Sequence, residues 1–283
     1  MESFINTWQQ LPFKINPAIF SIGSFQLRYY SMMYLVGFAI VYSLTVYRIK
    51  KENYEYTVET VQDYLLWAML GVILGARLGD VLIYNFSYFV RHPLEIFLPF
   101  SFSNGIKFTG ISGMSYHGGV IGVIIVSIFF MRIRKIDFWR FIDLAIPSVP
   151  LGYTFGRIGN FINGELWGRV TTMQWGMYFP LDSAHSLRHP SQLYEAFFEG
   201  IVLFILLWWM RKKKFADGVL VGLYILGYGF FRFMIEFFRE PDFIVGPISI
   251  GQLLCALMMA AGVIIMVWRS HASVSRINAQ AAS

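Results

Sequence analysis

The feature that most constrains this chain is a series of seven apolar segments separated by short polar or basic stretches. They cover residues 31–47, 64–83, 111–131, 141–161, 193–210, 219–238 and 248–268. Each is long enough to cross a bilayer as a helix, since a span needs about 20 mostly apolar residues. Only 14% of the residues are charged, whereas soluble domains carry about a quarter. The sequence therefore predicts an all-α polytopic membrane protein of about seven transmembrane helices.

Basic residues follow the odd-numbered segments, at positions 48–51, 132–135, 211–214 and 269. Because cytoplasmic loops carry an excess of Lys and Arg, this pattern predicts an N-terminus outside and a C-terminus in the cytoplasm. The stretches 84–112, 162–190 and 239–247 are then extracytoplasmic, and the first two are long enough to form a small head. Topology explains the net charge of +6, and no nucleic-acid partner is expected.

We find no internal repeat or linker, so residues 1–283 are predicted to form a single membrane domain. Residues 1–28 are expected to be an amphipathic lead-in on the membrane surface rather than a cleaved signal, since they lack a compact apolar run. The Ala/Ser/Gln-rich tail 271–283 is expected to be disordered. The single cysteine, Cys255, excludes an intrachain disulfide framework, and it is predicted in the inner half or near the middle of the last span.

Ionisable residues near the outer ends of the spans are the strongest functional signal, because such side chains are costly in lipid. Arg157 lies at the exit of the fourth segment. Four residues at the exit of the sixth fall on one helical face, namely Tyr228, Arg232, Glu236 and Arg239. Guanidinium groups bind phosphate bidentately, so arginines from two segments predict a phosphodiester clamp. The alternative is that these charges pair only with one another and join helices, as Arg77 and Asp80 are expected to do.

His117 opens the third segment beside Gly118 and Gly119. It is either a hydrogen-bonded core histidine or a general base, and the glycines indicate close approach of backbone or ligand. Ser191, at the start of the fifth segment, is expected to be a helix cap. The sequence contains no Walker loop, HExxH, GxSxG or Cys/His metal spacing, so no metal site or cofactor is predicted.

Together these motifs resemble the phosphatidylglycerol–prolipoprotein diacylglyceryl transferase family over nearly the whole chain. The main motif runs from Gly156 to Gly168, and the others lie, in order along the chain, at 28–34, 114–119, 189–195 and 228–242. The resemblance implies a bacterial inner-membrane enzyme. Its lipid substrate is phosphatidylglycerol, and its acceptor is the lipobox cysteine of a prolipoprotein signal peptide. The diacylglyceryl group moves to the cysteine thiol, a thioether forms, and glycerol phosphate leaves.

The resemblance and this chemistry together suggest roles for the motif residues. Arg157 and Arg232 are expected to neutralise the leaving phosphate, and His117 is the first candidate for the base, with Tyr228 or Tyr30 as alternatives. The remaining expected lipid-binding residues are Asn160, Asn163, Glu165, Gly168, Glu236 and Arg239, of which Gly168 is expected to allow a tight turn.

The competing interpretation from another class is a transporter or flippase that uses the same arginines for a phosphate-bearing lipid. The sequence disfavours it, because it shows no internal repeat and its polar groups gather toward one side of the bilayer.

Overall fold

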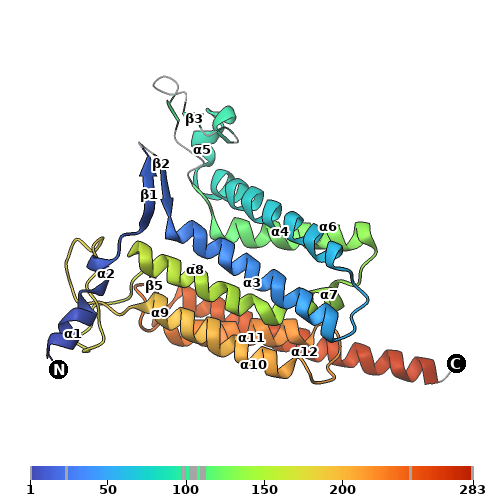
Figure 1. Cartoon of the computed structure of the whole chain (residues 1–283). Coiled ribbons are helices and arrows are strands. Elements are labelled where there is room, and N and C mark those ends of the chain that lie inside the picture. The colour runs from blue at the N-terminus through green and yellow to red at the C-terminus, as the bar shows by residue number, and fades with distance from the viewer. Residues whose placement is uncertain are drawn as a thin grey trace. The chain divides into compact units, whose positions relative to one another are not determined.

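The computed structural model describes residues 2–22, 25–96, 98, 100–101, 107–108, 113–241 and 244–281. Most of these residues are helical, and the chain divides into two compact units (Figure 1). One comprises Met1–Lys51 with Trp139–Ser283, and the other is Glu52–Phe138. The three strand pairs are short, two-stranded and antiparallel. The prediction of a helical membrane protein is confirmed.

The larger unit begins with two short helices and a hairpin: α1 (Glu2–Gln9), α2 (Leu11–Lys14), β1 (Ala18–Ile22) and β2 (Phe25–Arg28). Its long helical segments are α3 (Tyr29–Lys51), α7 (Phe138–Ala145), a 3₁₀ turn η3 (Ile146–Ser148), α8 (Val149–Asn163), α9 (Ser191–Glu195), a π-helix η4 (Ala196–Val202), α10 (Leu203–Met210), α11 (Val219–Ile235) and α12 (Ile250–Ala281). The pair β5 (Ile244–Val245) and β6 (Ile248–Ser249) joins the last two helices.

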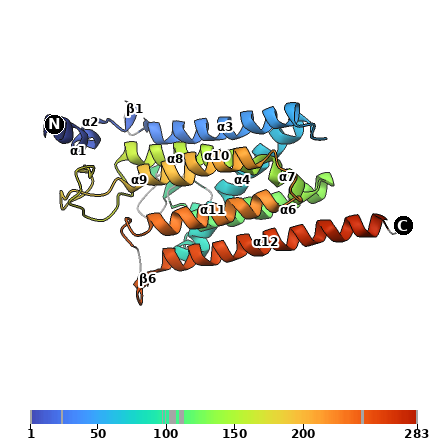
Figure 2. The ribbon, with the colours of Figure 1, turned by 90° about the horizontal axis from the view of Figure 1, so that it is seen from below.

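Helices α3, α8, α10, α11 and α12 run alongside one another (Figure 2). Small residues permit the closest contacts. A Cβ on Gly37 of α3 would lie 2.8 Å from the Gly152 carbonyl oxygen of α8, and one on Gly262 of α12 would lie equally close to the carbonyl oxygen of Gly222 in α11. Close approach of this kind is how helices associate in lipid, where no hydrophobic force drives them together.

One end of this unit is held by buried charges. The fully buried Arg48, in the last turn of α3, donates to the carbonyl oxygens of Asp143 at 2.7 Å and Leu144 at 2.6 Å. The Asp143 carboxylate accepts the backbone N–H groups of Gly218 and Val221 at the start of α11. The basic end of α3 therefore lies beside the first turn of α11, as the predicted common side for the basic clusters requires.

The smaller unit contains α4 (Val58–Gly79), a π-helical turn η1 (Asp80–Tyr84), α5 (Phe86–Phe89), the 3₁₀ turn η2 (Pro93–Ile96), the strands β3 (Phe100–Ser101) and β4 (Lys107–Phe108), and α6 (Tyr116–Arg134). Helices α4 and α6 pack antiparallel through Gly71, Gly75 and Gly79 against Gly118 and Gly122, where any Cβ would meet backbone or side chain of the other helix. The glycine beside His117 is thus explained by helix packing.

Within the part of the chain that the structure describes, five helices are long and apolar enough to span a membrane: Tyr29–Lys51, Val58–Tyr84, His117–Arg134, Ser191–Met210 and Ile250–Ala272. The sixth predicted segment forms the shorter apolar helix Val219–Ile235. The fourth is divided among α7, η3 and α8, because prolines at 147 and 150 interrupt it. The structure thus supports a multi-pass membrane protein, and the count of seven spans stays a prediction.

The last helix differs from the sequence prediction in where Cys255 lies. Helix α12 continues to Ala281, and the disorder expected for residues 271–283 stays a prediction. Cys255 is buried in the second turn of α12, near the start of the helix. Its predicted place, in the inner half or middle of the last span, was therefore wrong: α12 begins only at Ile250, and its first turns pack against α11.

Candidate active site

Arg157 lies on α8 with its guanidinium held by a neighbouring helix. Its Nε is 2.7 Å from Oε2 of Glu195, at the end of α9, and donates to the Tyr153 hydroxyl at 2.6 Å. Its Nη1 donates a long hydrogen bond of 3.4 Å to Asn160 Oδ1. The carboxylate that pairs with Arg157 therefore comes from the next apolar segment of the chain.

Glu195 is the centre of the cluster. Its side chain is 1% exposed and pairs with three arginines: Arg157 from α8, Arg232 at 3.0 Å from α11, and Arg239 just beyond α11. The two arginines predicted to form a clamp therefore converge on one carboxylate. A buried charge needs such partners, since its desolvation penalty is otherwise large.

The predicted grouping at the exit of α11 is confirmed for three of its four residues, of which Glu236 and Arg239 lie just beyond the last α11 residue. Glu236 Oε2 lies 3.4 Å from Arg232 Nη2 and 3.5 Å from Arg239 Nε. Glu236 also accepts a hydrogen bond of 3.1 Å from the Ser249 hydroxyl. A third carboxylate, Glu199 of η4, lies 4.0 Å from Arg232. The arginines thus do pair with carboxylates, as expected if these charges serve to join helices.

These ion pairs leave hydrogen-bonding capacity unused. Four buried atoms of the cluster have no hydrogen-bond partner among the described residues, although oppositely charged groups lie close: Glu199 Oε1, Arg232 Nη1, Glu236 Oε2 and Arg239 Nε. Buried polar groups are nearly always hydrogen-bonded, so unmet donors on two arginines are unusual. An anion that accepted those N–H groups would complete the site.

Three predicted binding residues are hydrogen-bonded to one another beside Arg157. Glu165 Oε1 accepts hydrogen bonds from Asn160 Nδ2 at 2.8 Å and from Asn163 Nδ2 at 3.4 Å. Asn160 in turn accepts the bond from Arg157. Asn160 thus contacts Arg157 directly, and Glu165 links Asn163 to Asn160, whereas their roles in binding the lipid stay predictions.

Two predicted tyrosines lie next to the same helix. The Tyr30 ring packs on α8 at Gly159, and its hydroxyl is 3.0 Å from the Tyr34 hydroxyl. The Tyr228 ring meets the Tyr153 ring edge-on, with centroids 5.8 Å apart. Both therefore lie beside α8, the helix that carries Arg157, whereas their catalytic roles stay predictions.

Gly168 does not form the tight turn that we expected. The backbone turns earlier, at Gly164 with φ 68° and Leu166 with φ 60°. Gly168 instead donates its N–H to the His189 carbonyl at 2.8 Å, and a Cβ there would collide with the Phe238 carbonyl oxygen. Glycine is needed for close approach of three chain segments.

Ser191 is not the cap of α9, so that prediction was wrong. Pro190 occupies the cap position, and the Ser191 hydroxyl donates to the Leu166 carbonyl at 3.0 Å. Helix α9 begins at Ser191 itself, one residue earlier than a serine cap would allow, because Pro190 takes the cap position.

His117 is the second residue of α6 and is exposed. It belongs to the smaller unit, whereas the arginine cluster belongs to the larger one. Its role as the base stays a prediction. Arg77 and Asp80, in the same unit, form the expected structural pair at 3.8 Å, and Arg77 also donates to the Ile96 carbonyl at 2.7 Å.

Sequence reasoning missed Tyr153 and Glu199, and it treated Glu195 only as the end of a motif. All three lie in or beside apolar runs, where any ionisable or polar group is a functional signal. The spacing of Glu195 and Glu199, four residues apart, could have placed both on one helical face.

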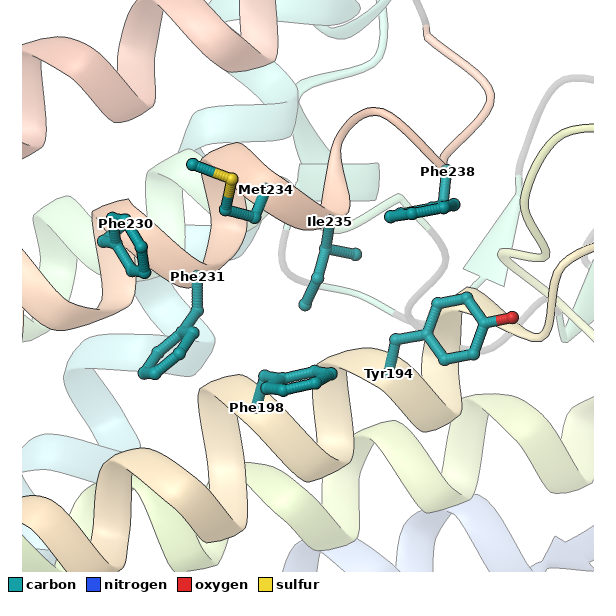
Figure 3. A pocket seen from close by; sticks show the side chains of 7 residues that line it. All are labelled: Tyr194, Phe198, Phe230, Phe231, Met234, Ile235 and Phe238. Atoms are coloured by element: carbon teal, nitrogen blue, oxygen red, sulfur yellow. The ribbon is translucent and has the colours of Figure 1, made fainter.

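An apolar groove of about 260 Å³ opens beside the charged cluster. Its lining residues come from α9, η4, α11 and the turn that follows: Tyr194, Phe198, Phe230, Phe231, Met234, Ile235 and Phe238. In Figure 3, Phe231 and Ile235 of α11 point toward the helical segment that carries Tyr194 and Phe198. Five of the lining residues are sequence neighbours of Glu195, Glu199, Arg232, Glu236 or Arg239. Charged and apolar binding surfaces therefore lie on adjacent faces of the same helices.

The loop between α8 and α9 is joined to the residues after α11 by an ion pair. Arg188 donates to both carboxylate oxygens of Asp182, at 2.8 and 3.0 Å, and to Glu240 at 2.8 Å. Arg169 adds a bond of 2.7 Å to the carbonyl of Arg239. The backbone that carries Arg239 is thus held by residues of this loop.

Hydrogen bonds from Arg188 hold the pKa of Asp182 below its ordinary value. A lowered folded pKa means that the pair stabilises this loop above about pH 4 and that this contribution is lost as pH falls through the folded value. We expect the hydrogen-exchange protection of residues 166–190, relative to the intrinsic rate at each pH, to fall below about pH 4, and Asp182→Asn to show lower protection already at neutral pH. Asp63→Asn, an exposed site in the other unit, is the control; equal exchange in all three proteins would contradict this role.

Among the described residues, no group of three or more His, Cys, Asp or Glu side chains is arranged to hold a metal ion.

The fold and site define a multi-pass helical membrane protein with a buried arginine–carboxylate cluster next to an apolar groove. The family model for prolipoprotein diacylglyceryl transferase matches residues 17–268, and the chain belongs to this family. It is 55% identical over 273 residues to the phosphatidylglycerol–prolipoprotein diacylglyceryl transferase of Chlorobaculum tepidum, covering 95% of this chain and 94% of that protein. The protein of the same name from Pseudoalteromonas translucida is 46% identical, over 90% and 92% of the two chains.

Proposed function

We propose that this protein transfers the diacylglyceryl group of phosphatidylglycerol to the lipobox cysteine of a prolipoprotein. The observation that carries the proposal is the convergence of Arg157 and Arg232 on Glu195, in a chain that belongs to the transferase family. A C–S bond forms at the diacylglyceryl carbon, and the bond from that carbon to the phosphate oxygen breaks. Glycerol phosphate leaves with the electron pair, and the thiol proton passes to a base.

The arginines supply what the leaving group needs. Negative charge builds on the phosphate as the C–O bond breaks, and preorganised donors stabilise it most in a site that excludes water. The unmet donors of Arg232 and Arg239 support phosphate binding there. Glu236, Asn160, Asn163, Glu165 and Gly168 then serve by fixing the arginines and the backbone around them, and the apolar groove supports binding of a lipid.

Three groups remain candidates for the base: His117, Tyr228 and Tyr30. The thiolate is the nucleophile, so one of them must accept the thiol proton. His117 stays the first candidate, because histidine is the side chain that most often serves as a general base.

We further propose that the enzyme spans the bacterial inner membrane seven times, with the N-terminus outside. Arg48 and its partners lie at the basic end of the larger unit, and basic residues favour the cytoplasmic side. With that end toward the cytoplasm, the arginine cluster at the other end of α11 lies toward the outer side. A lipid transporter is not favoured, since the well-covered relatives are named as transferases.

The test is a reconstituted reaction. The purified full chain is mixed with phosphatidylglycerol and a lipobox peptide, and glycerol phosphate release is followed together with the peptide mass. We expect release and a diacylglyceryl mass gain, neither of which occurs with a Cys→Ser peptide. A folded preparation that gives no mass gain would rule the proposal out.

A further inference from the structure

Tyr153 contacts the candidate site but has no role in the function proposed above. It lies one helical turn before Arg157, so both side chains share a face of α8. Its hydroxyl accepts the Arg157 Nε–H at 2.6 Å, and the guanidinium carbon lies 4.8 Å from the centre of its ring. One side chain thus contacts the arginine in two ways.

The direction of the tyrosine proton is fixed by Glu199. A phenol has one O–H to donate, and here it donates to Glu199 Oε2. The other possible acceptor, Glu195 Oε2, is 3.5 Å away. Because the proton faces Glu199, the oxygen lone pairs face Arg157. Glu199 is fully buried, so bulk water does not compete for this bond.

This chain of bonds decides which edge of the guanidinium faces the substrate. A guanidinium can grip two phosphate oxygens through Nε and one terminal nitrogen, or through both terminal nitrogens. Tyr153 and Glu195 both lie within 2.7 Å of Nε. The two terminal nitrogens, Nη1 and Nη2, can therefore donate to the phosphate. Among the described residues, they make only the 3.4 Å hydrogen bond from Nη1 to Asn160.

A hydroxyl is suited to this position for an electrostatic reason. Three carboxylates, Glu195, Glu199 and Glu236, already lie among the three arginines of the cluster. A further carboxylate on Arg157 would offset its charge and weaken its hold on phosphate, whereas a neutral oxygen orients it without doing so.

We propose that Tyr153 is a positioning residue that turns the terminal nitrogens of Arg157 toward the lipid phosphate, with Glu199 fixing the direction of its hydroxyl. This rests on the proposed transferase function. Misplacing a catalytic group by about 1 Å can cost on the order of 100-fold in rate.

The test is Tyr153→Phe, which removes the hydroxyl and keeps the ring. In the reaction with phosphatidylglycerol and a lipobox peptide, we expect kcat to fall about 10- to 100-fold while KM for the lipid changes less than about threefold. The reason is that Arg157 matters most when charge builds on the leaving phosphate. Tyr47→Phe is the matched control, because Tyr47 is an exposed tyrosine of α3 that stacks on Trp208. Its kcat should equal that of the wild type.

A second variant separates positioning from a general structural effect. Tyr153→Phe also leaves the buried Glu199 carboxylate without its donor, which could disturb the site by itself. Adding Glu199→Gln removes that charge but does not restore an acceptor for Arg157. The double variant should therefore stay as slow as Tyr153→Phe.

Recovery in the double variant, or a Tyr153→Phe kcat within twofold of the wild type, would overturn the proposal. If the wild-type chain itself forms no thioether, the transferase function fails instead, so the two failures are distinguishable.

Discussion

Replacing Arg157 by alanine is expected to lower kcat for diacylglyceryl transfer by about 10²- to 10³-fold. This is the usual loss when one preorganised donor to a developing anion is removed. Arg157 is the one arginine of the cluster on α8, so no residue of its own helix can replace it. The measurement is glycerol phosphate release under saturating lipid, with peptide mass as the second readout.

Two further variants sharpen this expectation. Arg157→Lys keeps the charge but cannot grip phosphate bidentately, so most of the loss should remain. Arg134→Ala removes an exposed arginine that pairs with Asp63 in the smaller unit, and it should leave kcat unchanged. Full activity in Arg157→Ala would show that Arg157 serves only to join helices and takes no part in transfer.

Replacing Glu195 by glutamine is expected to cause the largest loss of stability. The change keeps the shape but removes the charge that three arginines share in a side chain 1% exposed. Removing one partner from a buried ion pair costs about 3–5 kcal/mol, because the remaining charges are uncompensated. We expect a markedly lower thermal unfolding temperature in detergent, and little transferase activity in the protein that remains folded.

Glu240→Gln is the matched control for this variant. Glu240 also pairs with an arginine, Arg188, but its side chain is 60% exposed. Exposed pairs contribute at most about 1 kcal/mol, so its unfolding temperature should stay close to that of the wild type. If both glutamine variants unfold at the same temperature, the central role assigned to Glu195 is wrong.

Much of the fold could be predicted because lipid imposes strong rules on a sequence. Apolar length placed the helices, and the spacing of Arg232, Glu236 and Arg239 correctly placed their side chains next to one another at the exit of α11. The interruption of the fourth segment was harder to place. Prolines at 147 and 150 divide it into three short elements, and apolar content alone does not locate such breaks.

One part of the site could be predicted from the sequence, and the other part could not. The arginines and asparagines followed from one short motif, whereas the partner of Arg157 comes from another helix and depends on how α8 packs against α9 and η4. Glu199 lies in a π-helical stretch, and its neighbour Gly200 packs so closely on Thr154 that a Cβ would clash. Neither feature follows from a local pattern. The carboxylates themselves, isolated in an apolar run, were visible in the sequence.

The burial of Cys255 has a practical consequence for studying the protein. It is the sole cysteine of the chain and is 3% exposed, so thiol reagents should react slowly with the folded protein. An acceptor peptide can therefore be labelled or quenched through its own thiol in the presence of the enzyme. A single cysteine placed on an exposed position of α1 would likewise carry a fluorophore with little background, and Cys255 need not be removed first.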